Sequence, residues 1–370
     1  MNFTVDRADF GMLNGARVEL IRLSNGVVEA SILTYGAAIH SVRVPDREGQ
    51  LGDVALGHAT LAEYVDQPQF MGSTVGRLAN RVAGGRFMLD GTEYRVPTNN
   101  GPNSLHGGDQ GFDKANWQVL ALDTEGAASV TLGHVSPDGD QGYPGTLNVT
   151  ARYALDAANT LHVDYRAVSD AVTVVALSNH AYWNLAGEDS GRSALDHILT
   201  IPADHYLPTD ATAIPTGELR PVECTAFDFR APMPIAARVR DAGEAQLRIG
   251  RGYDHNWVVA HDIADHLRLM AHVLDPVSGR VMEVHSTQPG LQFYSGNFLD
   301  GSSVNKSGRM LRMGDAIALE PQQFPDTVNR PEFGSVRLEP GQVYRNQIAW
   351  RFGVQPAGNQ HHSRIEGEAV

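Results

Sequence analysis

The sequence predicts an all-β protein, a large antiparallel sandwich with few short helices, and three observations support this fold class. Apolar and polar residues alternate in steps of two along most of the chain, which is the period of a strand with one buried face. Turn residues interrupt these alternating runs at short intervals. Segments with the periodicity of a helix are few.

The alternation is clearest in two segments, LNVTARY at 147–153 and LHVDYRA at 161–167. Each predicts a half-buried strand, because every second side chain is apolar. Asp90-Gly91, inside the run FMLDGTEYRV, predicts a two-residue hairpin turn. Residues 275–279 link two further alternating runs in the same way.

Helices are expected only at 61–64 and at 233–239, where prolines limit the length of the second. Glycine and proline are spread evenly, and no low-complexity linker or repeat divides the chain. We therefore expect a single domain over residues 1–354. Residues 355–370 are polar and without pattern, which predicts a flexible C-terminal tail.

Composition excludes several classes of partner. Hydrophobic residues make up 42% of the chain and charged residues 19%, enough apolar material for a large core. The net charge of −14 and the scattered basic residues argue against nucleic acid and anionic membrane as partners. With Cys224 as the one cysteine, an internal disulfide is impossible. No leader or long apolar run is evident, so we expect a cytoplasmic protein.

Cofactor motifs are also missing from the sequence. No glycine-rich nucleotide motif follows a predicted strand, and no His-Glu-x-x-His occurs. Histidines are not paired at metal-ligand spacing except for His361 and His362, which lie in the predicted tail. We therefore expect no cofactor and no metal.

Polar clusters at the predicted strand ends are the remaining candidates for chemistry. The segment GRLANR at 76–81 brings together Arg77, Asn80 and Arg81, and the planar guanidinium of Arg81 can donate to hydroxyl groups of a ligand. The segment NSLHGG at 103–108 presents His106 from a glycine-rich turn. Either cluster could instead be structural, with arginines on the surface and a histidine that caps a turn.

Three further residues follow or precede apolar segments. The run at 171–177 leads to His180, which is placed to exchange protons near neutral pH. Asp254 and Glu320 also lie at strand ends, and the apolar approach to Glu320 should raise the pKa of its carboxyl. The alternatives are a satisfied core histidine and a glutamate that caps an element or forms a salt bridge.

Taken together and in this order, the five clusters resemble those of the aldose 1-epimerase (galactose mutarotase) family. The resemblance spans roughly residues 15–352 and includes further motifs. These are GFDK at 111–114 with Trp117, GYPG at 142–145, QFYSGN at 292–297 and residues 322–326.

The resemblance implies a β-supersandwich with one shallow polar sugar cleft and no cofactor. It assigns His180 as the general acid and Glu320 as the general base. It implies a free monosaccharide as the ligand, and we expect a monomer or weak dimer. The residues that it assigns to the sugar hydroxyls are Asn80, Arg81, His106, Asp254 and Gln292.

The chemistry explains this choice of residues. Interconversion of anomers requires a base at the C1 hydroxyl and an acid at the ring oxygen, so the two groups must flank one C–O bond. Aromatic neighbours such as Tyr182, Trp183 and Phe293 could cover the sugar or pack in the core. The sequence departs from the family pattern at Gln69-Phe70 and Gly57-His58, which could alter the rim of the cleft.

Three other functions stay open at this point. Asp254 and Glu320 could be the paired carboxylates of a glycosidase. The same scaffold could be a sugar-binding module without catalysis. A hexose 6-phosphate epimerase is the third, with Arg77 and Arg81 at the phosphate.

Overall fold

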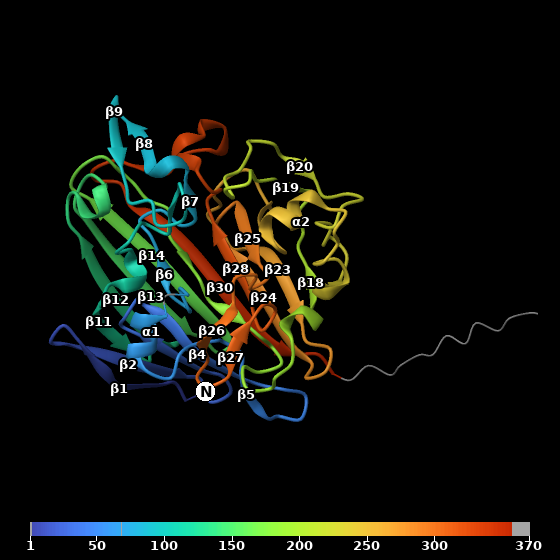
Figure 1. Ribbon diagram of the computed structural model, residues 1–370. Coiled ribbons are helices and arrows are strands. Elements are labelled where there is room, and N and C mark those ends of the chain that lie inside the picture. Colours follow the sequence, from blue (N-terminus) through green and yellow to red (C-terminus); the bar gives the residue numbers. More distant parts are fainter. Residues whose placement is uncertain (1, 68, 357–370) are drawn as a thin grey trace, which may run out of the picture.

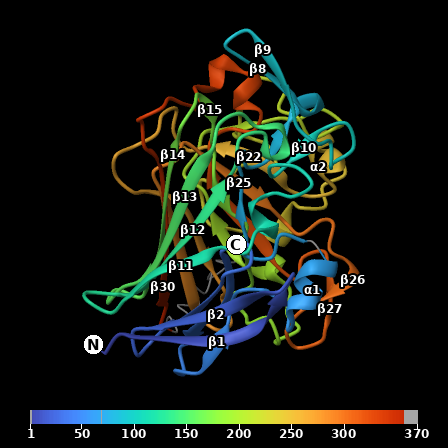
Figure 2. The same ribbon diagram turned by 90° about the vertical axis from the view of Figure 1, so that its left-hand side faces the viewer.

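The computed structural model describes residues 2–67 and 69–356, and within them the predicted all-β fold class is confirmed. The predicted tail, 355–370, lies outside the described residues from 357 onward, as do His361 and His362. Antiparallel strands form two large sheets that share a core, with a third sheet at one end (Figures 1 and 2).

The largest sheet has nine strands, and its central hairpin confirms both strands predicted from alternation. Ala151 pairs with Tyr165, and both are fully buried with their neighbours on the inner face. The predicted turn at 275–279 is also confirmed, because it joins two adjacent strands. In order across the sheet the strands are β11 (Gln118–Asp123), β12 (Ala128–Ser136), β13 (Leu147–Leu155), β14 (Thr160–Ser169), β30 (Tyr344–Val354), β24 (Arg280–Ser286), β23 (Arg268–Leu274), β18 (Ile198–Thr200) and β21 (Met233–Pro234).

The six-stranded sheet positions the site. Trp257, Phe293 and Leu319 point from one of its faces into the core that the six-stranded and nine-stranded sheets share. Side chains alternate along a strand, so the residues between them point to the opposite face. Figure 1 shows β25 and β28 side by side in this sheet. Its order is β17 (Tyr182–Trp183), β28 (Ile317–Gln322), β25 (Gly290–Tyr294), β22 (Asp254–Val258), β19 (His205–Leu207) and β20 (Arg220–Pro221).

A five-stranded sheet covers one end of the sandwich. Its buried Ile21, Ile32 and Ile39 belong to the same core as the two larger sheets. Figure 2 shows β1 and β2 crossing below the strands β11 to β14. The order is β1 (Thr4–Leu13), β2 (Ala16–Ser24), β3 (Glu29–Leu33), β4 (Ala38–Pro45) and β5 (Leu51–Asp53).

Short strand pairs connect the sheets. The hairpin predicted at Asp90-Gly91 is confirmed by the pairing of Leu89 with Thr92. In the apolar run at 171–177, residues 173–177 are buried and Ala171 is exposed, and only residues 173–174 form a strand. The pairs are β6 (Thr74–Val75) with β16 (Ser178–Asn179), β7 (Arg81–Val82) with β10 (Ser104–Leu105), β8 (Arg86–Leu89) with β9 (Thr92–Arg95), β15 (Thr173–Val174) with β29 (Arg337–Leu338), and β26 (Asp300–Val304) with β27 (Met310–Arg312).

One of the two helix predictions is confirmed. The helix α1 (Leu61–Asp66) begins after Thr60, which forms a capping box with Glu63. The prediction at 233–239 is wrong in its length, because β21 and then a single 3₁₀ turn occupy that segment. A second helix, α2 (Ala245–Gly250), was not predicted and has only six residues.

Seven 3₁₀ turns complete the regular structure of the described residues. Neither α-helix in the described part of the chain is long and apolar enough to cross a membrane. The 3₁₀ turns are Ala83–Gly85, Phe112–Lys114, Asp140–Gly142, Ala194–Asp196, Ile235–Ala237, Thr327–Asn329 and Pro331–Phe333.

Candidate active site

A cleft of about 450 Å³ opens on the face of the six-stranded sheet that points away from the shared core. Its size lies within the range of ligand pockets, about 300–1,000 Å³. Six of the seven residues that the sequence analysis selected line it, and Gln292 lies directly behind Asp254. The six are Asn80, Arg81, His106, His180, Asp254 and Glu320.

Strand register brings three of the selected residues to one face. Gln292 on β25 pairs directly with Glu320 on β28, so their side chains share a face. Asn256 on β22 pairs with Gln292, and Asp254 lies two residues earlier on the same strand and therefore on the same face. The Gln292 Nε2 donates to Asp254 Oδ1 at 2.8 Å, which holds that carboxylate in place.

Arg81 joins this group from the other side of the cleft. Its Nη2 lies 3.4 Å from Asp254 Oδ2, and its Nε donates to Asn100 Oδ1 at 3.0 Å. The side chains of Arg81 and Asp254 are about one-tenth exposed, so the pair is well shielded from water. The planar fork of the guanidinium can make both contacts at once, with further N–H groups left over for a ligand.

The β7–β10 pair places His106 beside Asn80. The His106 amide donates to the Asn80 carbonyl at 3.0 Å, and the Asn80 amide donates to His106 Nδ1 at 3.1 Å. Because Nδ1 accepts a hydrogen bond, the neutral imidazole carries its proton on Nε2. His106 is therefore a hydrogen-bond donor, suited to hold a hydroxyl oxygen.

His180 and Glu320 meet in the cleft from distant parts of the sequence. His180 lies between β16 and β17, and its Nε2 is 3.7 Å from Glu320 Oε1. Both side chains are more than nine-tenths buried. Neither His180 Nδ1 nor Glu320 Oε2 has a hydrogen-bond partner among the described residues, although both atoms are buried. Buried polar groups without partners are uncommon and often have a functional role.

Burial shifts the pKa values of these groups in opposite directions. It raises the pKa of the Glu320 carboxyl well above its usual value, and the negative charge of Asp254 adds to the shift. Burial lowers the pKa of His180 to about 4 and that of His106 well below its usual value. These shifts favour the neutral imidazole of His180 and the protonated carboxyl of Glu320 over their ionised forms.

The same cluster offers a possible set of metal ligands, which sequence spacing did not indicate. One ligand atom each from His106, His180 and Glu320 lies within 4.8 Å of the other two. A metal on His106 Nε2 would need that atom without its proton, and Nδ1 would then carry it. The Asn80 amide already donates to Nδ1, so the hydrogen bonding opposes a metal at this position.

Arg77 does not belong to the cleft. It is buried, and its guanidinium donates to Ser136 Oγ at 2.9 Å and to the Pro144 carbonyl at 2.7 Å. These bonds fasten the loop after β12 to the core, which is the structural alternative considered for this residue. Arg77 is thus unavailable for the phosphate of a hexose phosphate.

The aromatic neighbours divide between cleft and core. Tyr182 lines the cleft, with its ring 4.9 Å from that of His180. Trp183 and Phe293 are fully buried in the core, so the alternative of core packing holds for these two. Strand alternation explains the division for Tyr182 and Trp183, since neighbouring residues point to opposite faces.

Sequence reasoning missed several residues of the cleft. Gln69 and Phe70, noted only as a departure from the family pattern, line it, whereas His58 is buried elsewhere against the Val304 carbonyl. Nothing in the sequence marks the loop residues, because only the folded chain brings them to the rim. Leu105 and Tyr294 lie within two of the quoted motifs but were not selected as site residues. The other missed residues are Asn100, Gly101, Pro102, Ala211, Thr212, Ala213, Ile249, Gly250 and Phe298.

Comparison with known proteins assigns the family. Residues 19–351 match the family model of aldose 1-epimerase. The chain is 43% identical to galactose mutarotase of Rattus norvegicus over 95% of this chain and 99% of the rat protein. It is 36% identical to aldose 1-epimerase of Escherichia coli, over 91% of this chain and 95% of that protein.

Solved structures agree with this assignment. The crystal structure of galactose 1-epimerase from Lactobacillus acidophilus matches with a TM-score of 0.83 and 28% identity, covering 95% of this chain and 99% of that one. An aldose epimerase homologue from C. elegans matches with a TM-score of 0.81 and 30% identity, covering 89% and 97%. The chain belongs to the aldose 1-epimerase family.

Proposed function

We propose that this protein is an aldose 1-epimerase that interconverts the α and β anomers of free aldoses such as galactose and glucose. The observation that carries the proposal is the pair formed by His180 and Glu320. Their reactive atoms are 3.7 Å apart in a sugar-sized cleft, and each side chain keeps a buried polar atom without a partner among the residues that the structure describes. O1 and O5 of a cyclic aldose are both bonded to C1, so two neighbouring groups can serve both oxygens.

The proposed ring opening is balanced in protons and electrons. Glu320 as a carboxylate removes the proton from the O1 hydroxyl, and the C1–O1 bond becomes a carbonyl. The C1–O5 bond breaks, its electron pair goes to O5, and O5 takes a proton from the protonated His180. After rotation about C1–C2, the same steps in reverse close the ring on the other face.

The two residues act as a pair that carries one exchangeable proton. Ring opening starts with that proton on His180 and ends with it on Glu320, and reclosure returns it. The opposite pKa shifts favour the form with protonated Glu320, which is the form that recloses the ring. Since both forms have the same number of protons, a bound sugar has only to move a proton within the site.

The remaining polar residues are proposed to hold the sugar while C1 rotates. Arg81 and His106 donate hydrogen bonds, and Asp254 accepts them from the hydroxyls. Gln292 fixes Asp254 through its own hydrogen bond at 2.8 Å. Groups that hold the rest of the chain and leave C1 free favour reclosure over escape of the open form.

The geometry favours this function over the alternatives. In a glycosidase both carboxylates must be free to act on the glycosidic bond. Here Asp254 is engaged by Gln292 and Arg81, while Glu320 Oε2 has no partner within the described residues. A phosphorylated sugar would need a cation for its phosphate. Arg77 cannot supply it, because its guanidinium is held in the core.

Three further properties complete the proposal. We propose that residues 1–354 act as one catalytic unit, since the cleft draws residues from 69 to 320. The enzyme is proposed to act as a monomer or weak dimer, because all seven residues proposed for catalysis and sugar binding come from one chain. One cysteine in the whole chain suits a reducing compartment such as the cytoplasm.

Polarimetry of freshly dissolved α-galactose and α-glucose tests the proposed function. The protein should accelerate the change in optical rotation well beyond the spontaneous rate, whereas a binding module would leave that rate unchanged. A chromogenic galactoside serves as the control and should stay uncleaved. Cleavage of the galactoside, or an unchanged rate of mutarotation, would contradict the proposal.

A further inference from the structure

Phe70 has an unusual backbone conformation at the edge of the cleft. Its φ is 57°, in the left-handed region that bulky side chains rarely adopt. The neighbouring backbone maintains this conformation, because the Phe70 carbonyl accepts from the Ser73 amide and the Gly72 amide donates to the His180 carbonyl at 3.0 Å. A strained residue that its surroundings hold in place is a common feature of functional sites.

The ring of Phe70 lies against both imidazoles of the site. Its centroid is 4.7 Å from that of His106 and 5.7 Å from that of His180. The two imidazoles in turn meet edge to face at 5.2 Å. Phe70 is only half-buried, and it lines the cleft. One part of the ring therefore covers the histidines while another part remains open to a ligand.

We propose that Phe70 is a further functional residue that shields His106 and His180 from water and offers an apolar surface to the C–H face of the bound sugar. The contact with the sugar rests on the proposed function, whereas the shielding does not. A flat aromatic surface suits this contact, because a pyranose presents C–H groups between its hydroxyls. With its backbone in the left-handed region, Phe70 holds its ring against both imidazoles.

His180 has several charged and titratable neighbours besides Phe70. Glu320 lies opposite, Asp254 contributes a negative charge, and the rings of His106, Tyr182 and Tyr294 pack around it. Burial is the largest cause of its low pKa. Removal of the Phe70 ring admits water to the imidazole and leaves these neighbours in place, so the pKa of His180 should rise toward its ordinary value.

The substitution Phe70→Gly separates function from structure. Glycine adopts a positive φ without strain, so the variant should melt at the same temperature as the wild type or higher. Loss of the ring should raise KM by about 3- to 10-fold. The acid limb of the pH profile of kcat/KM should also move to higher pH. Phe70→Leu keeps an apolar cover and should show a smaller shift of that limb.

A matched aromatic substitution provides the control. Phe298 lines the same cleft, but its ring stacks on Tyr294 rather than on an imidazole. Phe298→Leu should therefore leave the acid limb where it is. An equal shift in Phe298→Leu and Phe70→Gly would overturn the specific shielding role of Phe70.

Proton NMR of the histidine rings makes the test independent of activity. The resonances of His180 and His106 are assigned by their loss in His180→Asn and His106→Asn, and each is titrated in the wild type and in Phe70→Gly. A raised pKa of His180 in the variant supports shielding even if the protein proves not to be a mutarotase. An unchanged pKa together with a lower melting temperature would overturn the proposal and make Phe70 a structural residue. An unchanged KM in an active enzyme would overturn the sugar contact alone.

Discussion

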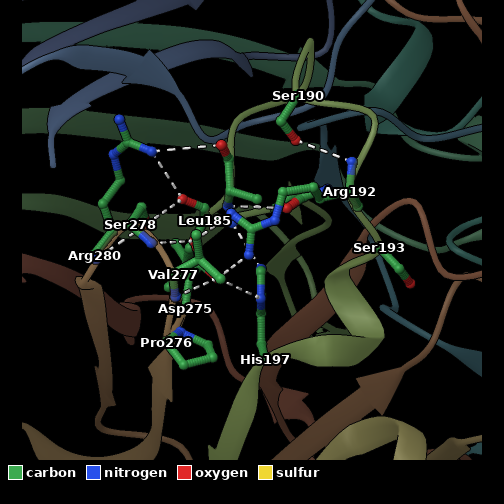
Figure 3. A network of polar contacts seen from close by, with 12 residues as sticks. Leu185, Ser190, Arg192, Ser193, His197, Asp275, Pro276, Val277, Ser278 and Arg280 are labelled. Carbon is green, nitrogen blue, oxygen red and sulfur yellow. Dashed lines mark hydrogen bonds and ion pairs between the residues drawn. The ribbon is translucent and has the colours of Figure 1, made fainter.

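Two of the buried carboxyl groups, those of Asp275 and Glu320, have surroundings that are arranged in opposite ways. Asp275 is fully buried, and its two oxygens accept from Arg192 at 2.6 and 3.1 Å, with Ser278 as a further donor (Figure 3). Glu320 is just as deeply buried, but one of its oxygens has no partner within the described residues. The same chemical group is therefore fully bonded in one region and left unsatisfied in the other.

The contrast appears in the protonation of the two groups. Burial favours the protonated form of Asp275, but the hydrogen bonds from Arg192 and Ser278 outweigh it and hold the pKa well below its usual value. Nothing outweighs burial at Glu320, and its pKa is raised. A permanently ionised carboxylate can fasten the turn at 275–279, whereas a carboxyl that changes its protonation state can do acid–base chemistry.

The largest expected effect is on catalysis. Glu320→Gln and His180→Asn should each lower kcat by about 10²- to 10⁴-fold, the usual contribution of a positioned proton-transfer group. Neither variant should lose stability, because one polar atom of each replaced side chain, His180 Nδ1 or Glu320 Oε2, has no hydrogen-bond partner in the described part of the chain. Polarimetry and thermal melting measure the two effects. Near-normal turnover in either variant would remove that residue from its role.

The opposite result is expected for the paired carboxylate. Asp275→Asn should lower the free energy of unfolding by about 2–3 kcal/mol, since it leaves the Arg192 charge without its counter-ion. This loss of stability is small for a buried ion pair, because the Arg192 side chain is 31% exposed and water screens its charge. Urea denaturation measures the change, and kcat of the folded enzyme should stay the same. A large loss of kcat without loss of stability would contradict the division between the two regions.

The catalytic pair and the Asp275 region should also respond differently to pH. Below about pH 4 a second proton binds to the catalytic pair at His180, so kcat/KM should fall with decreasing pH. On the alkaline side kcat/KM should fall only above the raised pKa of Glu320. Asp275 has a lowered pKa, so its stabilisation is complete above the unfolded-state value of about 3.9 and is lost as the pH falls through the folded value. As the pH falls, activity measured by polarimetry should decline before circular dichroism shows loss of the fold.

A smaller effect is expected from the residues that hold the sugar. Arg81→Lys replaces a fork that contacts Asn100 and Asp254 together with a single ammonium group. KM should rise by about tenfold, and kcat should fall by less than that. Steady-state polarimetry over a range of galactose concentrations measures both values. A change in kcat as large as that of Glu320→Gln would place Arg81 in the proton transfer itself.

Much of the fold was predictable because its signals are local. The alternation at 147–153 and 161–167 reports one buried face, and Asp90-Gly91 reports a tight turn, so these elements could be predicted from short stretches of sequence. The helix predicted at 233–239 was wrong in its length because local preference there yields to a strand and a 3₁₀ turn.

The site was predictable in its members rather than in its geometry. Motif resemblance selected His180 and Glu320, but their separation depends on strand pairings between segments far apart in sequence. The proton on His106 Nε2 depends on an amide of Asn80 in another segment. The role of Phe70 depends on its backbone angle, for which the sequence offers no glycine or asparagine as a signal.

Carbon-13 NMR of glutamate side chains tests most directly the claim that burial raises the pKa of the Glu320 carboxyl. The protein is labelled at the glutamate carboxyl carbons, and Glu320→Gln identifies the resonance of interest. We predict that this resonance stays in the protonated form at pH values where exposed glutamates are fully ionised, and titrates well above the usual pKa. A Glu320 resonance that titrates with the exposed glutamates would contradict the account.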